Sequence, residues 1–255
     1  MATTNGATAP TQEMKQPLLF KQIEGLDPAR HGNLKLDRVH RNYRFVRNVS
    51  AVPVTILEFW AAGVDYPIIF TEGPEPVPLV AMSYRPEENL FVDSAGVWNP
   101  ETYIPTYVRG YPFAVIDDLA AQRMVACVDA QGQGIGSEIG EALFENGKPT
   151  AMLNEIVEFC GGHSNAFRNT REMGRILAES GVLVPHQATV NLGAGREDAR
   201  ITGFQAVDAN KLLELPDATF LAWRKRGILP AVYQHLHSLC CWRKISAAAQ
   251  KRLAE

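Results

Sequence analysis

The sequence predicts an α+β protein in which a strand-rich, antiparallel N-terminal half precedes a helical C-terminal half within a single compact domain. Short apolar runs separated by turn clusters fill the first half of the 255 residues. The connections between these runs are too short for helical crossovers, which favours antiparallel pairing. Apolar residues recur at near-helical spacing over residues 153–181, and further helical patterns follow.

The chain begins with a polar tail and two short elements. Residues 1–16 contain too few large apolar side chains to offset the entropy of ordering, so we expect them to be disordered. The alternation over residues 43–46 predicts a short strand with one exposed face. Residues 57–65 are predicted to form a short helix. Its packing side chains are expected to be Leu57, Phe59, Trp60 and Ala61.

Strand patterns then follow one another closely. Residues 66–70 and 77–83 flank a Gly- and Pro-rich cluster and predict an antiparallel hairpin. Residues 89–93 read as another strand, and residues 113–117 and 124–129 as a further pair. Prolines argue against regular helix between these strands. They are Pro100, Pro105 and Pro112.

The second half is predicted to be mainly helical. The long helix over residues 153–181 contains Gly161-Gly162 as a weak point. Residues 187–192 and 200–205 alternate like a hairpin, and three shorter helices are expected after it. Those helices cover residues 208–213, 217–227 and 230–244. We therefore expect a disordered tail over 1–16, a folded domain over 17–245 and a basic tail over 246–255.

Charge and hydropathy exclude several classes of protein. The formal net charge is −3, from 25 basic and 28 acidic residues, so wholesale nucleic-acid binding is not expected. No stretch approaches the roughly 20 apolar residues that span a bilayer, and the N-terminus lacks the apolar region of a secretory signal. We expect a cytoplasmic protein without a membrane span, or one exported without a cleaved signal.

No recognised metal or cofactor motif is present. The four cysteines have no CxxC or CxxH spacing, and His235 and His237 would lie about 200° apart around a helix. The glycine-rich stretch at residues 132–136 lacks both nucleotide-binding signatures, and no GxSxG nucleophile motif occurs. We therefore predict no bound metal and no cofactor, and the sequence assigns no catalytic residue.

The C-terminal region carries a local excess of positive charge. Residues 222–255 contain seven Lys or Arg residues and one acid, together with Trp223, Tyr233 and Trp242. Such a segment could dock on an anionic partner or surface, but a solvated helix face is the favoured interpretation.

An aromatic segment with a central arginine is the strongest candidate site. Trp98, Tyr103 and Tyr111 surround Arg109 on a proline-rich stretch. These residues either bury aromatic area while Arg109 donates to loop carbonyls, which is the favoured interpretation, or line a ligand cleft in which Arg109 anchors an anion. Tyr233 and His235 are added as candidate ligand-binding residues, with the Tyr233 ring expected to be largely buried.

The order and spacing of several motifs resemble the bacterial SapC family, the surface-layer-associated proteins rather than the peptide-transport permease of the same name. The central motifs are Asn89-Leu90-Phe91-Val92-Asp93, Gly96-x-Trp98 and Tyr103-x-Pro105-x-x-x-Arg109-x-Tyr111-Pro112-Phe113. The flanking motifs include Tyr66-Pro67-Ile68, Leu213-Glu214-Leu215-Pro216-Asp217 and Tyr233-x-His235-Leu236-x-Ser238-Leu239. The resemblance extends over residues 18–243.

The resemblance implies a binding or accessory component linked to the bacterial cell envelope or surface layer, with envelope or surface-layer proteins as partners. The family brings no accepted catalytic residues and no established activity. Two alternatives stay open: an enzyme or small-ligand-binding protein with Arg109, Tyr233 and His235 in one pocket, working with outer-membrane nutrient uptake, and an interaction protein that docks through its basic C-terminal segment. The oligomeric state stays open.

Overall fold

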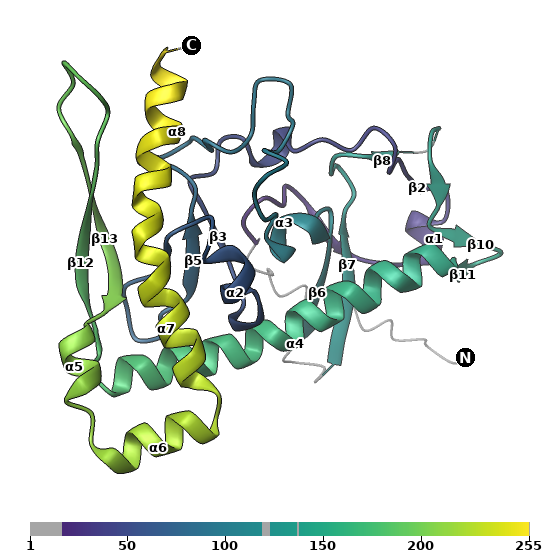
Figure 1. Ribbon diagram of the computed structural model, residues 1–255. Coiled ribbons are helices and arrows are strands. Elements are labelled where there is room, and N and C mark those ends of the chain that lie inside the picture. Colours follow the sequence, from purple (N-terminus) through teal and green to yellow (C-terminus); the bar gives the residue numbers. More distant parts are fainter. Residues whose placement is uncertain (1–16, 119–122, 137, 255) are drawn as a thin grey trace, which may run out of the picture.

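The larger of two main sheets lies beside the C-terminal helices (Figure 1). The computed structural model describes residues 17–118, 123–136 and 138–254, so the expected N-terminal tail lies outside the described residues. This sheet is antiparallel, and each neighbouring pair is joined by hydrogen bonds. Its strand order is β12 (Leu183–Val190), β13 (Ala199–Val207), β4 (Ile68–Phe70), β5 (Pro78–Ala81) and β3 (Ala51–Pro53).

A second, smaller sheet is formed by the N-terminal strand and a hairpin. Its order is β1 (Ile23–Gly25), β7 (Arg123–Asp129) and β6 (Phe113–Asp118). Two minor ladders lie beyond it. They are β8 (Ile135–Gly136), β2 (Lys35–Leu36) and β9 (Glu141–Ala142), and then β10 (Phe144–Glu145) with β11 (Lys148–Pro149). The predicted antiparallel, strand-rich first half is thus confirmed.

Helix α4 (Ala151–Glu179) links the two regions. Figure 1 shows it running along the lower side of the molecule, from the minor strands to α5 (Ala209–Leu213). The Thr150 side chain caps its first turn by accepting from Leu153 N. The helix is unbroken at Gly161-Gly162, where we expected a weak point.

Short helices complete the architecture. In the first half these are α1 (Pro28–His31), η1 (Arg44–Val46), η2 (Ile56–Glu58), α2 (Phe59–Ala62) and α3 (Thr106–Gly110). The C-terminal set is α6 (Asp217–Lys225), α7 (Ile228–Ser238), η3 (Leu239–Cys241) and α8 (Trp242–Ala254). Residues 246–254, assigned above to a tail, are the last turns of α8, and Ala249 there is fully buried.

Two strand predictions were wrong because local hydrogen bonds form turns instead. Asn42 Oδ1 accepts from Arg44 N at 3.1 Å, and Val46 N donates to Tyr43 O, so residues 44–46 form a 3-10 turn. In residues 89–93, Asn89 Oδ1 accepts from Phe91 N at 2.9 Å. Only an isolated bridge from Val92 to Trp98 remains in that segment.

The region between residues 97 and 113 contains a helix that the prolines were expected to prevent. Pro105 is the N-cap of α3, and Pro112 follows the residue that ends the helix. Proline is tolerated next to a helix start and just beyond a helix end. The two prolines therefore delimit α3 rather than exclude it.

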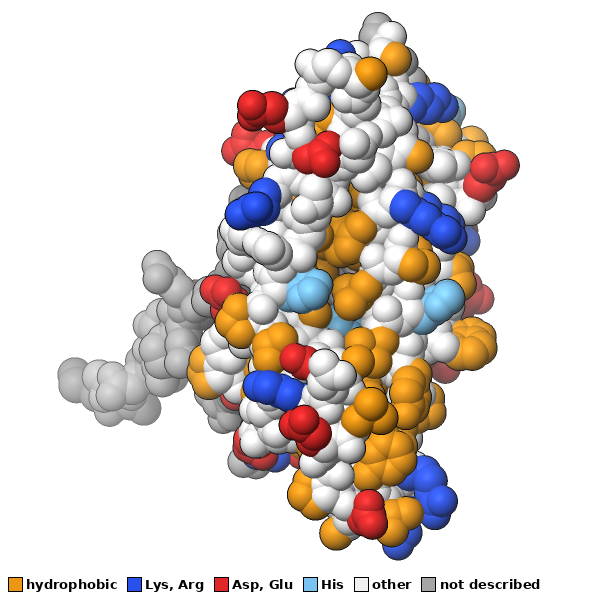
Figure 2. All heavy atoms as spheres, turned by 60° about the vertical axis from the view of Figure 1, so that its left-hand side comes forward, with side chains coloured by type: hydrophobic (Ala, Val, Ile, Leu, Met, Phe, Trp, Pro, Cys, Tyr) orange, Lys and Arg blue, Asp and Glu red, His pale blue; other side chains and the backbone are white. Residues whose placement is uncertain are grey.

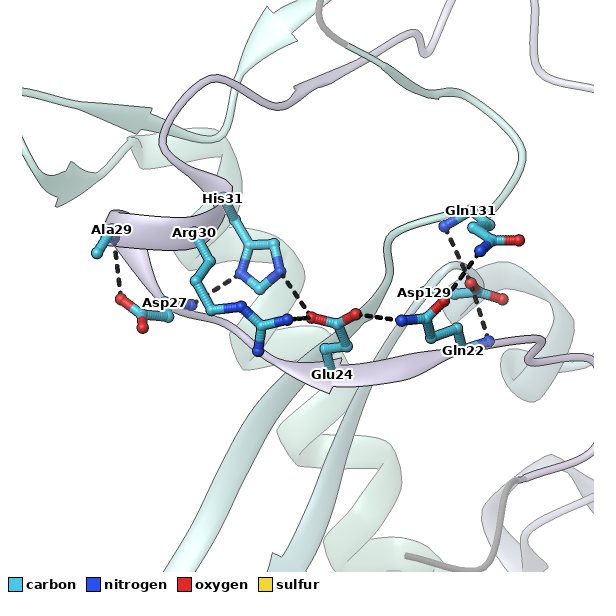
Figure 3. A network of polar contacts seen from close by, with 8 residues as sticks. All are labelled: Gln22, Glu24, Asp27, Ala29, Arg30, His31, Asp129 and Gln131. Carbon is cyan, nitrogen blue, oxygen red and sulfur yellow. Dashed lines mark hydrogen bonds and ion pairs between the residues drawn. The ribbon is translucent and has the colours of Figure 1, made fainter. Parts of the chain in front are cut away.

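A buried carboxylate fixes the N-terminal strand to the smaller sheet. Asp129 is fully buried and accepts from Lys21 N at 2.7 Å and from Gln131 N at 3.1 Å. Nearby, Glu24 pairs with Arg30 and with His31 Nε2 at 3.5 Å (Figure 3). The network ties β1 and α1 to the end of β7, so we assign it a structural role.

Candidate ligand cleft between α3 and α4

Three adjoining pockets meet around Phe159 in the seam between α3 and α4. We call them the apolar pocket, of about 380 Å³, the arginine pocket, of about 300 Å³, and the acidic pocket, of about 510 Å³. The Phe159 side chain contributes to the wall of all three and is 39% exposed. Together the three pockets form what we call the α3–α4 cleft.

The Glu58 carboxylate anchors the N-terminal end of α3 through hydrogen bonds. The side chain is 5% exposed. One oxygen accepts from Tyr103 Oη at 3.0 Å and from Thr106 N at 2.6 Å, and the other accepts from Thr55 N at 3.0 Å and Thr55 Oγ1 at 2.8 Å. Burial acts to raise the pKa of Glu58, but the hydrogen bonds from Thr106 and Thr55 outweigh it and lower this pKa. Glu58 is therefore a carboxylate that anchors the start of α3.

Arg109 lies at the end of α3 with its guanidinium held in a defined orientation. Its Nη2 donates to Tyr103 Oη at 3.1 Å and to Thr106 Oγ1 at 2.8 Å. The guanidinium carbon lies 5.6 Å from the Tyr103 ring centre and 5.4 Å from that of Phe159. Among the residues that the structure describes, Arg109 has no ion-pair partner.

The loop carbonyls that Arg109 was expected to satisfy are bound by Arg41 instead. Arg41 Nη2 donates to the carbonyl oxygens of Arg109 at 2.6 Å and of Val108 and Tyr111 at 3.4 Å. Arg41 thus neutralises the C-terminal end of α3. This contact leaves the Arg109 side chain free to face the arginine pocket, which it lines together with Arg38 and Arg41.

His163 contributes an unpartnered nitrogen to the same cleft. It lines both the apolar and the acidic pocket, and its Nε2 is buried without a hydrogen-bond partner in the described part of the chain. Burial lowers the pKa of His163; Glu58 opposes this shift and Arg109 adds to it. The imidazole is therefore neutral at pH 7, and its Nε2 is left without a partner among the described residues.

Five Phe and Tyr rings contribute to the wall of the apolar pocket. They belong to Phe20, Tyr107, Phe113, Phe159 and Phe167. Cys160 also lines it, and burial raises the pKa of this thiol to about 12, so it is not a nucleophile at neutral pH. Arg168 and Arg171 lie at the rim and are paired with Asp117 and Glu75. The volume and lining suit a small apolar group.

Only part of the predicted site is brought together. Tyr103 and Arg109 are in contact, and Arg109 and Tyr111 line the same arginine pocket. Tyr111 is 4% exposed and stacks on Phe45 at 4.3 Å between ring centres. Trp98, 3% exposed, lies instead beside a larger cavity of about 880 Å³ along α8.

Tyr233 and His235 lie in α7, outside these pockets. His235 is fully buried, its Nδ1 lies 2.9 Å from Ile68 O, and its Nε2 accepts from Val207 N at 3.0 Å. It therefore connects α7 to β4 and β13. The prediction of a buried Tyr233 ring was wrong, since this residue is 49% exposed.

The buried face of α7 explains both placements. It runs through Ile228, Leu229, Val232, His235 and Ser238, and is rotated from the apolar stripe of Leu229, Val232, Leu236 and Leu239 on which the prediction of a buried Tyr233 relied. This rotation turns His235 inward and Tyr233 outward. A pocket containing Arg109, Tyr233 and His235 is therefore not formed by the cavities described above.

Positive charge on the C-terminal helices is dispersed rather than concentrated. Figure 2 shows Lys and Arg side chains scattered over this side of the molecule, with hydrophobic side chains gathered at the height of α5 to α7. Two of the bases are also paired: Lys244 with Asp65 at 2.9 Å and Arg226 with Glu172 at 3.5 Å. These observations favour a solvated helix face.

Neither a membrane-spanning helix nor a cluster of metal-ligating side chains is present in the described residues. Across residues 17–118, 123–136 and 138–254, no helix is long and apolar enough to cross a membrane. In the same ranges no three His, Cys, Asp or Glu side chains are grouped as a metal site would require.

The sequence did not single out Glu58, Phe159 or His163 as site residues. Glu58 follows Thr55 by three residues, the spacing of a capping box, which the structure shows. That motif was the available signal for an ordered helix start there. His163 and Phe159 lie one helical turn apart, but nothing in the sequence shows which tertiary neighbours α4 meets.

The fold and the cleft define an α+β protein with three adjoining pockets between a short and a long helix. The chain matches the SapC family model over residues 26–245, nearly its whole length, and it belongs to the SapC family. Searches of curated proteins and of solved structures found no match.

Proposed function

We propose that this protein is a non-catalytic accessory protein that binds a small molecule with an anionic group and an apolar body in the α3–α4 cleft. The observation that carries the proposal is the state of Arg109. Its guanidinium is oriented by two hydroxyls, stacked on two rings and unpaired within the described residues. An anion anchor requires this combination of fixed geometry and free donors.

The guanidinium retains donors for a ligand. The hydrogen bonds from Arg109 to Tyr103 and Thr106 both use Nη2, and a guanidinium carries five N–H donors in a planar fork. That fork matches the geometry of a carboxylate or a phosphate. Because stacking on Tyr103 and Phe159 limits side-chain motion, less conformational entropy is lost when an anion binds.

The apolar pocket supplies the second half of the recognition. Gly110, Phe113 and Phe159 line both the apolar pocket and the arginine pocket, so the two pockets adjoin, and the proposed ligand spans their boundary. An apolar body among the aromatic rings would place its acidic end at Arg109. The neutral His163 can exchange a hydrogen bond with a polar group on that body.

Membership of the SapC family supports the link to the cell envelope. The family's association with a surface layer makes envelope or surface-layer proteins the partners we propose for the ligand-bound protein. The absence of accepted catalytic residues in that family, together with the protonated Cys160, supports binding rather than catalysis.

The proposal is tested by calorimetric titration with acid and alcohol pairs of matched shape. Phenylacetate and octanoate should bind at least about tenfold more tightly than 2-phenylethanol and octan-1-ol, because only the acids pair with Arg109. In Arg109→Gln this preference should disappear. Arg175→Gln, which removes an exposed arginine paired with Glu172 and Glu179 on α4, is the matched control.

Two results would contradict the proposal. One is equal binding of acids and alcohols by the native protein. The other is an acid preference that survives in Arg109→Gln but is lost in Arg171→Gln, which would place the anion at the outer rim of the apolar pocket.

A further inference from the structure

A strip of exposed apolar side chains borders the acidic pocket. The expectation that Leu57 and Trp60 are packing residues was wrong, since they are 77% and 73% exposed, and Val64 is 51% exposed. Leu57 lies in η2, Trp60 in α2 and Val64 in the turn that follows α2, at spacings of three and four residues. We call these three residues the α2 strip. An exposed tryptophan beside two aliphatic residues is a surface typical of protein interfaces.

The backbone beneath the α2 strip is fixed, so the strip is presented in one orientation. Phe59 and Ala62 of α2 are 1% and 0% exposed and belong to the main core. Ile56 N donates to Thr170 Oγ1 of α4 at 3.0 Å, and Cys241 Sγ donates to Gly63 O at 3.4 Å. A preordered surface loses little entropy on docking.

The acidic pocket lies at one end of the α2 strip and places negatively charged side chains beside it. Leu57 lines this pocket together with Glu155, Glu158 and Phe159. The two glutamates are exposed, lie about one helical turn apart on α4, and have no ion-pair partner among the described residues. Among the described residues that line this pocket there is no lysine or arginine.

We infer that the α2 strip and the acidic pocket together dock a peptide segment of another protein that carries large apolar side chains flanked by Lys or Arg. One apolar side chain would enter the pocket between Leu57 and Phe159, while the adjacent bases would meet Glu155 and Glu158. Charge complementarity selects this occupant, because Glu155 and Glu158 have no ion-pair partner among the described residues and the described lining of the acidic pocket includes no lysine or arginine. The inference does not rest on the small-molecule function proposed above.

The test is a selection from a displayed library of random 16-residue peptides on the purified full-length protein, with counter-selection on Leu57→Ser/Trp60→Ser. Both positions are more than 70% exposed, so the variant should fold, and an unchanged thermal midpoint checks this. Leu213→Ser, at an 80% exposed position on α5, is the matched control. Peptides that bind the native protein and the control but not the double variant should be enriched in Lys or Arg beside Leu, Phe or Trp.

A selected peptide is then measured by the fluorescence of Trp60, the most exposed of the four tryptophans. Its dissociation constant should rise at least about tenfold in Glu155→Gln/Glu158→Gln and should also rise with salt. Three outcomes would overturn the inference: no peptide distinguishes the native protein from the double variant, the distinguishing peptides are acidic, or the α2 strip instead mediates self-association that Leu57→Ser abolishes.

Discussion

Replacing Glu58 by glutamine tests how α3 is anchored. The carboxylate accepts four hydrogen bonds, two from Thr55 and one each from Tyr103 and Thr106. An amide has one acceptor oxygen and one donor nitrogen. Whichever way it turns, the backbone N–H of Thr55 or of Thr106 faces another donor.

The expected cost follows from this arrangement. One unsatisfied buried donor costs about 1–3 kcal/mol, and the remaining bonds lose the assistance of a charged acceptor. We therefore expect Glu58→Gln to lower the free energy of unfolding by about 2–4 kcal/mol at pH 7. For a chain of 255 residues this corresponds to a fall in thermal midpoint of roughly 5–15 °C.

The folded-state pKa of Glu58 determines how the stability difference between the native protein and Glu58→Gln changes with pH. The pKa of Glu58 is lower in the folded protein than its ordinary value of 4.5. Its contribution is therefore complete above pH 4.5 and is lost as the pH falls through the folded pKa. The difference between the native protein and Glu58→Gln should be constant from pH 7 to pH 5.5 and should shrink below pH 4.5.

Urea denaturation at each pH measures this difference. The exposed Glu155→Gln serves as the control and should stay within about 0.5 kcal/mol of the native protein. The reasoning is refuted if Glu58→Gln is equally close to the native protein at pH 7, or if its deficit does not change between pH 7 and pH 3.5.

Further predictions concern α4, α7 and the N-terminal segment. Gly161→Ala and Gly162→Ala should each raise the free energy of unfolding by up to about 1 kcal/mol, because a Cβ at either position meets no atom within 4 Å; a loss in urea melts would contradict this. His235→Ala should cost about 4 kcal/mol by the same measurement, since it leaves Val207 N and Ile68 O unpaired around a cavity. Burial lowers the pKa of His235 from 6.5 to about 4, so the native protein should lose roughly 3 kcal/mol of stability from this group as the pH falls across that range; His235→Gln should lack this loss. Tyr233→Ala should cost less than about 1 kcal/mol, and a loss of several would mean that its ring is buried. Removal of residues 1–16 should leave the thermal midpoint within about 2 °C in a calorimetric scan.

Much of the fold could be predicted because its signals are local. The hairpins β4–β5 and β6–β7 are short apolar runs bounded by turns, β12–β13 has an alternating pattern, and α4 has a long helical period. The errors came from short segments in which side chains compete with the backbone ladder. Asn42 and Asn89 form turns where apolar neighbours suggested strands.

The candidate site was predicted only where its residues are close in sequence. Tyr103 and Arg109 lie six residues apart, and the proline-flanked aromatic segment drew attention to both. Glu58 lies 45 residues before Tyr103, and His163 lies 60 residues after it. Tertiary packing brings both into the same cleft, and a single sequence gives no local signal for such long-range contacts. For α7, the prediction considered only apolar residues and did not expect His235 and Ser238 to be buried. The expected buried face was therefore rotated from the observed one, and Tyr233 was wrongly placed on it.

A crystal structure of the protein with bound phenylacetate tests the central claim most directly. The account predicts the carboxylate within hydrogen-bond distance of the Arg109 guanidinium and the ring among the aromatic side chains of the apolar pocket. A ligand bound instead in the larger cavity along α8, or a carboxylate paired with Arg171 while Arg109 makes no contact with it, would contradict the account.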